Sequence, residues 1–321
     1  MKGIQTVKVS NRYAKYDFQL FRNITIVRGA SGTGKTTLYQ MIADYTRGKE
    51  KSGVNLSSTA PCIALTDTDW KYQLSRIKGS IVFIDEDSQY ITSVEFAQAV
   101  KNSDNYYVIF NREGLHNLPS SVNEIYEIKT SGKYHRFEKM YSFDEKNEYK
   151  ASGKGKASVP DILLTEDTNS GFQFFDSVTK ERSIHCEAAG ANSAIFAWLK
   201  AHSTEKTLIL CDGAAFGAEI DRVSKLIDKA ENVRLILPES FEWMILKSGI
   251  IEEVNTVLEN PSEFIESSEY FSWETYFTAL LIEKTHDTYL AYTKVKLNTC
   301  YLHPSEKSAI LAVLPDLFPD S

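Results

Sequence analysis

Eight consecutive residues carry the clearest chemical signal in the sequence: Gly29, Ala30, Ser31, Gly32, Thr33, Gly34, Lys35 and Thr36. They fit the pattern GxxxxGK[ST] and lie between an apolar run that predicts a strand (residues 23–27) and a periodic stretch that predicts a helix (residues 36–46). Glycines let the backbone N–H groups turn inward around phosphate oxygens, and the helix N-terminus adds positive potential. We therefore expect a nucleotide phosphate site in which Lys35 reaches the β- and γ-phosphates, Thr36 binds Mg²⁺ and Thr37 completes the lining.

An acidic stretch after a predicted strand has the composition that nucleotide hydrolysis needs. Residues 81–84 are all apolar and predict a strand, and Asp85, Glu86 and Asp87 follow directly. We expect Asp85 to hold Mg²⁺, directly or through water, and Glu86 to polarise the attacking water. An apolar strand followed by an acidic turn is common on its own, so this interpretation depends on the glycine-rich loop.

The next predicted strand, residues 106–110, also ends in polar residues, namely Asn111, Arg112 and Glu113. We expect Asn111 to lie beside the γ-phosphate. For Arg112 three interpretations stay open: it stabilises transition-state charge in its own chain, it reaches a neighbouring subunit, or it is an ordinary surface arginine.

Residues 1–145 resemble P-loop ATPases through these three elements, and residues 81–87 resemble a Walker B motif. The leading strands and the stretch SGTGKTTL are similar to ABC-type ATPases, whereas Asn111 resembles the sensor residue of AAA-type ATPases. The sequence has no LSGGQ-like signature before Asp85, and only about 45 residues separate Lys35 from the acidic strand. The resemblance therefore implies a minimal ATPase with ATP and Mg²⁺ as cofactors.

Alternating strands and helices must position these groups. The pattern predicts a leading hairpin at residues 7–10 and 16–20 and a closing hairpin at residues 127–130 and 134–141. Between them it predicts strands at residues 62–66, 81–84 and 106–110, and a helix at residues 93–101. Such alternation predicts an α/β domain with a mostly parallel sheet.

Two more carboxylates follow predicted strands in the second half of the chain. Glu166 and Asp167 follow residues 161–165, and Asp212 follows residues 207–211. With strands at 183–188 and 233–237 and helices between them, the order is β-α-β-α-β-α-β, and open parallel sheets place their sites at such strand ends. The alternative is a doubly wound domain whose carboxylates cap helices or accept backbone hydrogen bonds.

Residues 159–245 resemble a Toprim domain, the metal-binding module of topoisomerases, primases and overcoming-lysogenisation-defect (OLD) nucleases. Glu166 matches the family's glutamate, Asp212 matches the first aspartate of its DxD pair, and Ala214 stands in place of the second aspartate. The resemblance implies that Glu166 and Asp212 are catalytic and bind Mg²⁺ for phosphodiester cleavage. Three further carboxylates are candidates for the missing ligand: Glu219, Asp221 and Glu239.

Composition and charge predict how the chain divides into domains. The chain has 321 residues and a net charge of −7, but residues 1–157 carry +6 and residues 158–321 carry −13. A Gly-, Ser- and Lys-rich stretch predicts a flexible linker at residues 146–158, between an ATPase domain (1–145) and a Toprim-like domain with a partly helical C-terminal region (159–321). The apolar runs are too short for a membrane span, so we expect a cytoplasmic protein without membrane partners.

A basic hairpin offers a further surface. Lys129, Lys133, His135, Arg136 and Lys139 decorate the closing hairpin, beside three tyrosines. They fit either a solvated edge protected by lysines or a contact with a nucleic-acid backbone.

The order of the two domains resembles OLD-type ATPase–nucleases of prokaryotic defence systems. It implies an ATPase that controls a Mg²⁺-dependent, nucleic-acid-cleaving effector, with DNA or RNA as substrate and a homo-oligomer or protein partner. The alternative is an ATP-dependent switch or scaffold whose Toprim-like domain is inactive and binds a protein; Ala214 and the acidity of residues 158–321 favour it. A nucleic-acid motor is a third interpretation, and the single short ATPase core counts against it.

Overall fold

The computed structural model describes residues 1–150, 159–315 and 317–318. They form two compact units, each with its own sheet, as the sequence predicts for an α/β protein. Unit 1 contains Met1–Met140 and Asn260–Ser272, and unit 2 contains Tyr141–Glu259 and Trp273–Ser321. Each unit is described by itself below.

Unit 1 is built on a nine-stranded, mostly parallel sheet with the order β4-β1-β2-β9-β8-β3-β7-β6-β5. Its strands are β1 (Gln5–Ser10), β2 (Lys15–Leu20), β3 (Ile24–Arg28), β4 (Asn55–Ser58), β5 (Cys62–Leu65), β6 (Ile81–Ile84), β7 (Tyr106–Phe110), β8 (Ile125–Ser131) and β9 (Tyr134–Lys139). Both predicted hairpins are confirmed, because β1 pairs with β2 and β8 with β9 in antiparallel fashion. The sequence analysis missed β4, a short polar strand that pairs with β1 at the sheet edge.

Burial explains which strands lie in the centre. All residues of β3, β6 and β7 are buried, as expected for parallel strands covered on both faces, whereas β2 alternates between buried and exposed residues. The strand β7 pairs on one side with β3 and on the other with β6. Three neighbouring strands therefore end at one edge of the sheet with the glycine-rich loop, Asn111 and Asp85.

The helices of unit 1 are α1 (Lys35–Gly48), α2 (Trp70–Arg76) and α3 (Val94–Lys101), with short 3₁₀ turns at η1 (Lys49–Ser52), η2 (Gln89–Thr92) and η3 (Val122–Glu124). The predicted helix at residues 36–46 is confirmed and slightly longer. Ser93 caps α3 by accepting a hydrogen bond from the Phe96 N–H, which fixes the start of that helix close to its predicted position. The helix α2 was not predicted.

Unit 2 contains a four-stranded, wholly parallel sheet with the order β11-β10-β12-β13. Its strands are β10 (Ile162–Thr165), β11 (His185–Ala188), β12 (Thr207–Leu210) and β13 (Val233–Ile236). The helices are α4 (Ser170–Lys180), α5 (Asn192–Ala201), α6 (Ile220–Ile227), α7 (Phe241–Lys247), α8 (Asn255–Glu259), α9 (Trp273–Thr285) and α10 (Pro304–Leu311), with a 3₁₀ turn at η5 (Thr299–Leu302). The expected β-α-β-α-β-α-β order is confirmed.

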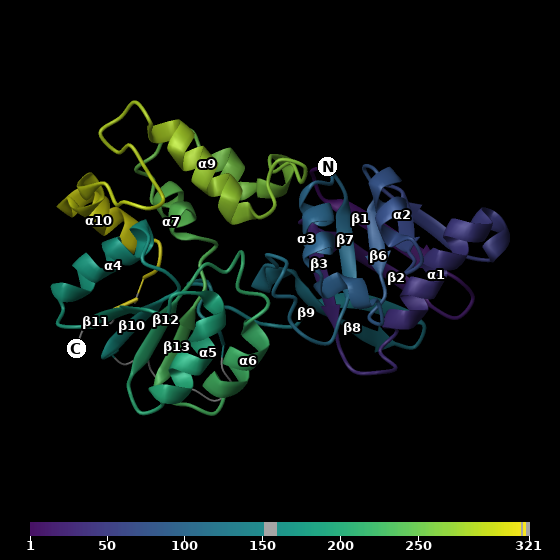
Figure 1. Ribbon diagram of the computed structural model, residues 1–321, viewed down its shortest axis with the longest axis horizontal. Coiled ribbons are helices and arrows are strands. Elements are labelled where there is room, and N and C mark those ends of the chain that lie inside the picture. The colour runs from purple at the N-terminus through teal and green to yellow at the C-terminus, as the bar shows by residue number, and fades with distance from the viewer. Residues whose placement is uncertain (151–158, 316, 319–321) are drawn as a thin grey trace. The chain divides into compact units, whose positions relative to one another are not determined.

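Helices cover both faces of this sheet. Figure 1 shows α5 and α6 on one face and α4 and α7 on the other. The main core of unit 2 lies with α4 and α7: Phe174, Met244, Phe277 and Leu281 are fully buried in one apolar cluster. Because α9 contributes the last two of these, the C-terminal region is part of the unit 2 core.

The division of the chain differs from the predicted boundaries at two places. Residues 141–150 pack within unit 2, where the Glu148 carboxylate forms a 2.8 Å ion pair with Arg234. Residues 151–158 of the predicted linker lie outside the described residues. Residues 260–272, expected in the second domain, pack within unit 1 and include η4 (Pro261–Glu263).

Candidate functional sites

Backbone geometry shapes the glycine-rich loop between β3 and α1. Gly29, Gly32 and Gly34 have φ angles of 131°, 84° and 102°, a region that side-chain-bearing residues rarely adopt. A Cβ on Gly34 would come within 2.8 Å of the Tyr16 hydroxyl oxygen, which itself donates a 2.9 Å hydrogen bond to the Gly34 carbonyl. The fold therefore requires glycine at this position, where α1 begins.

The side chain of Lys35 is buried at the base of this loop, with 3% of its surface exposed. Its ammonium group donates hydrogen bonds to the carbonyl oxygens of Gly29 and Ala30, and lies 3.5 Å from a Glu86 carboxylate oxygen. A buried ammonium group is stable only with such partners. The same cation can exchange these carbonyl contacts for phosphate oxygens.

Glu86 is held between two cations. Arg112 donates a 2.8 Å hydrogen bond to the Glu86 carboxylate, and Lys35 approaches that carboxylate from the loop. The hydrogen bond from Arg112 is the main reason that the pKa of Glu86 is lowered; burial opposes it and Lys35 adds to it. Glu86 is therefore a carboxylate at neutral pH, the form that can polarise a water molecule.

Asp85 and Thr36 are the residues expected to hold Mg²⁺ in this unit. Burial raises the pKa of Asp85, the Glu86 N–H bonded to its side chain lowers it, and the charges of Asp87, Glu86 and Asp67 raise it further. A nearby cation would offset that repulsion. Thr36 is exposed in the first turn of α1, and its hydroxyl oxygen is a suitable Mg²⁺ ligand.

Asn111 lies in a second hollow beside Glu86, lined also by Asp87, Arg112 and Glu113. Its side-chain amide donates a 2.9 Å hydrogen bond to the Glu113 carbonyl and its side-chain oxygen accepts one from the Arg112 N–H. These bonds fix the turn after β7, which directs Arg112 toward Glu86.

The residues that line the loop cavity fit a nucleotide phosphate chain. The cavity is lined by residues 31–37 and Glu86, so seven of the nine predicted binding residues surround one space. Of the two expected Mg²⁺ ligands, Thr36 lines this cavity and Asp85 does not. A Cβ on Gly32 would meet no atom within 4 Å, which leaves this part of the loop open to a ligand.

The second site follows from the strand order of unit 2. The connection from β10 leads to β11 on one side and the chain then continues with β12 on the other side. In open parallel sheets ligands bind at the carboxyl ends of the strands where the order reverses. Glu166 directly follows β10, Asp212 is the second residue after β12, and both line one pocket there.

The Glu166 and Asp212 carboxyl groups both have raised pKa values, and the charge of Glu166 contributes to the rise at Asp212. Burial is the largest cause for both; it raises the pKa of Glu166 to about 7, with Glu274 and Asp167 adding to it, and that of Asp212 well above its usual range. The positive charge of nearby Lys294 lowers both pKa values. One oxygen of Glu166 is buried without a hydrogen-bond partner among the described residues. The site therefore favours a proton or a cation at neutral pH.

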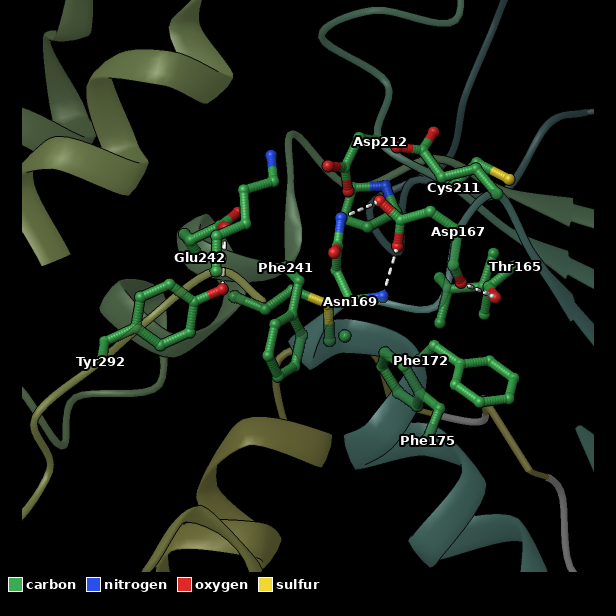
Figure 2. A pocket seen from close by; sticks show the side chains of 16 residues that line it. Thr165, Asp167, Asn169, Phe172, Phe175, Cys211, Asp212, Phe241, Glu242 and Tyr292 are labelled. Atoms are coloured by element: carbon green, nitrogen blue, oxygen red, sulfur yellow. Dashed lines mark hydrogen bonds between the residues drawn. The ribbon is translucent and has the colours of Figure 1, made fainter. Parts of the chain in front are cut away.

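Four side chains in and around this pocket were missed by the sequence analysis: Glu242, Glu274, Tyr292 and Lys294. Lys294 forms an ion pair with Glu274, and the charges of Glu274 and Glu242 raise its pKa although burial opposes this. Tyr292 donates a 2.8 Å hydrogen bond to Glu242. Figure 2 shows this bond on one side of the pocket, with Asp167 and Asp212 on the other.

The candidates for the third metal ligand lie elsewhere. Glu219 and Asp221 form ion pairs with Arg222 and Lys225 on their own helix, and neither lines the pocket, nor does Glu239. Ala214 is buried, and its N–H bonds to the Glu239 carbonyl. Among the residues that the structure describes, no cluster of three or more His, Cys, Asp or Glu side chains could hold a metal ion.

Two basic residues of the unit 1 hairpin are paired with carboxylates of the same hairpin. Lys129 forms a 2.7 Å ion pair with Glu127, and Arg136 lies 4.0 Å from Glu138. His135 instead packs inward, stacked on Tyr16 beside the glycine-rich loop. This arrangement favours the interpretation as a solvated edge.

The functional assignment of this chain depends on the geometry of the two sites. Neither the models of known protein families nor the curated protein sequences match this chain. None of the helices in the described part of the chain has the length and apolar character that a membrane crossing requires.

Proposed function

We propose that this chain is an ATPase that binds and hydrolyses Mg-ATP at the loop of residues 29–37 and thereby controls a Toprim-like effector in unit 2. The observation that carries the proposal is the buried Lys35 ammonium group 3.5 Å from Glu86, at the base of a loop with three left-handed glycines. A buried cation, inward backbone N–H groups and a carboxylate base are the parts that phosphoryl transfer needs.

Each residue has a separate task in this reaction. The loop N–H groups and Lys35 bind the phosphate chain, and Thr36 and Asp85 would hold Mg²⁺, which offsets phosphate charge when bound. Glu86 polarises the attacking water, and Asn111 orients groups beside the γ-phosphate. Arg112, already bonded to Glu86, is placed to stabilise the transferring phosphoryl group from within its own chain.

Nucleotide binding tests the first part of the proposal. A Lys35→Ala variant loses the charge-assisted contact with phosphate, so its affinity for ATP should fall at least about 100-fold by titration calorimetry. The exposed Lys51, on the 3₁₀ turn after α1, gives the matched control Lys51→Ala, which should bind like the wild type. Unchanged affinity in Lys35→Ala would remove the phosphate-loop assignment.

For unit 2 we propose Mg²⁺-dependent cleavage of DNA or RNA by Glu166 and Asp212, as the resemblance to OLD-type nucleases implies, with a role in anti-phage defence. Two carboxylates at a strand-order reversal, both with raised pKa values, support a cation site there. Mg²⁺ keeps several waters, so two carboxylates can hold one ion.

One observation favours a second candidate function. Among the described residues, no third carboxylate joins Glu166 and Asp212 in a cluster that could bind a metal ion, and Lys294 brings a positive charge to the site. Unit 2 therefore also fits an inactive module that binds a protein partner under ATP control.

Cleavage assays separate the two candidates. Plasmid DNA, single-stranded DNA and tRNA would be incubated with Mg²⁺ or Mn²⁺, with and without ATP, and wild type compared with Glu166→Ala and Asp212→Ala. Cleavage that is lost in both variants supports the nuclease. No cleavage by wild type under any condition, with ATP turnover intact, supports the switch.

A further inference from the structure

The chain itself connects the two candidate sites through a short segment. After Glu259 the chain leaves unit 2, packs within unit 1 from Asn260 to Ser272, and returns to unit 2 at Trp273. We name residues 260–272 the strap. The strap therefore belongs to unit 1, and the residues that flank it, Glu259 and Trp273, belong to unit 2.

The strap is firmly attached to unit 1. The Gly3 N–H donates a 2.6 Å hydrogen bond to the Ser262 carbonyl, and the Asn23 side-chain amide donates a 3.1 Å bond to the Phe271 carbonyl. Ser262, Ile265 and Ser267 are buried. Hydrogen bonds to the Ser262 and Phe271 carbonyls thus hold the strap near both of its ends, and its middle is packed.

The attachment at Phe271 acts on the strand that carries the glycine-rich loop. Asn23 directly precedes β3, and its carbonyl accepts a 2.7 Å hydrogen bond from the Tyr107 N–H of β7. All five residues of β3 are buried and the strand ends one residue before Gly29. A strand of this length spans roughly 17 Å, and packed interiors transmit displacements over such distances.

On the C-terminal side of Phe271, the chain soon reaches a residue next to the unit 2 site. Only Ser272 and Trp273 separate Phe271 from Glu274, which lies in the first turn of α9. Glu274 forms an ion pair with Lys294, and its charge acts on both Glu166 and Asp212. A displacement of Phe271 therefore reaches, within three residues, a carboxylate that sets the charge around that site.

We propose that the strap couples nucleotide occupancy of the loop to the position of the first turn of α9. This inference rests on the proposed binding of ATP to unit 1. A nucleotide that shifts β3 moves Phe271, and the start of α9 follows, so that Glu274 changes its distance from Lys294. Because Coulomb energy varies with distance, the electrostatic potential at Glu166 and Asp212 then depends on the nucleotide.

An insertion in the chain tests the coupling. Six residues of alternating Gly and Ser between Ser272 and Trp273 leave both units intact but replace the direct connection with a flexible one. The matched control carries the same insertion between Glu252 and Glu253, in the loop before α8, where both flanking elements belong to unit 2. Hydrogen exchange of peptides covering residues 273–285 is measured with Mg²⁺, with and without adenylyl-imidodiphosphate.

The nucleotide analogue should change the exchange rates in the first turn of α9 by about threefold or more in wild type and in the control. The variant with the insertion after Ser272 should bind the analogue with wild-type affinity and show no such change. Unaltered exchange in β10 and β12 verifies that its unit 2 is folded.

The alternative outcomes are distinct. If the analogue binds but α9 does not respond in wild type, or if the response persists after the insertion, the coupling is refuted and the ATPase proposal stands. If the analogue does not bind to wild type, the proposed function fails, and the coupling fails with it.

Discussion

The two candidate sites are assembled in different ways. In unit 1 one contiguous stretch, residues 29–37, forms most of the phosphate site, and two neighbouring strand ends add Glu86 and Arg112. In unit 2 the pocket takes its charged groups from strand ends and helices far apart in the chain, such as Glu166, Glu242 and Lys294. A contiguous site is fixed by backbone geometry, whereas a dispersed site is fixed by packing.

The two sites also balance charge differently. In the loop site Glu86 lies between Lys35 and Arg112, so its pKa is lowered. In the unit 2 site the carboxyl groups outnumber the single lysine, so the pKa values of Glu166 and Asp212 are raised. The charge balance of the loop site favours an anionic ligand, and that of the unit 2 site favours a proton or a cation.

The largest effect is expected from Glu86→Gln. Removing the general base should lower ATP turnover by about 10²- to 10⁴-fold, while ATP binding is retained, because Lys35 and the loop still hold the phosphates. Steady-state phosphate release and calorimetric binding measure the two quantities. Glu50→Gln, on the exposed 3₁₀ turn after α1, is the control. An equal loss of binding and turnover would assign Glu86 to folding or metal binding instead.

Gly34→Ala tests whether backbone geometry determines the loop site. The new Cβ would approach the Tyr16 hydroxyl oxygen to 2.8 Å at a φ of 102°, so we expect unit 1 to lose about 1–3 kcal/mol of unfolding free energy and to bind ATP poorly. Gly132→Ala is the matched control, because its φ is 60° and its Cβ would meet no atom within 4 Å. Urea unfolding that affects both variants equally would contradict the steric explanation.

The charge balance of unit 2 predicts a pH dependence with a definite sign. Burial raises the pKa of Glu166 from 4.5 to about 7, so the folded state binds more protons than the unfolded state in this range. In EDTA the contribution of Glu166 to the stability of unit 2 should therefore fall as the pH rises from 4.5 to about 7 and stay constant above it.

Glu166→Gln removes this contribution, and it should be more stable than wild type by about 3 kcal/mol at pH 8 but not at pH 4. Hydrogen exchange of β10 and β12 measures the difference, and Glu231→Gln, an exposed residue, is the control. If the pair holds Mg²⁺, adding the ion at pH 8 should stabilise wild type and not Glu166→Gln. The opposite slope with pH would refute the proposed charge balance.

The smallest effect is expected from Arg112→Ala. Without the 2.8 Å hydrogen bond from Arg112 the pKa of Glu86 should rise, so the acidic limb of the ATPase pH profile should move to higher pH. Arg136→Ala, on the outer face of the hairpin, should leave the limb in place. A lower turnover at all pH values without this displacement would place Arg112 at the phosphoryl group rather than at Glu86.

The sequence by itself determined the local parts of this protein. Continuous apolar runs predicted β3, β6 and β7, because such runs form strands buried on both faces. Three glycines before Lys35 predicted the loop, since only glycine adopts its backbone angles without strain. The predicted strand ends also placed Glu166 and Asp212 correctly at the carboxyl edge of a parallel sheet.

Tertiary structure alone decided which distant residues meet. The insertion of β7 between β3 and β6 brings Arg112 to Glu86. Lys294 and Glu274 meet at the unit 2 site although 20 residues separate them and no pattern marks either one. Residues 260–272 belong to unit 1 because Gly3 and Asn23 bind their backbone. Local periodicity records which face of an element is buried, but the partner of that face depends on how the whole chain packs.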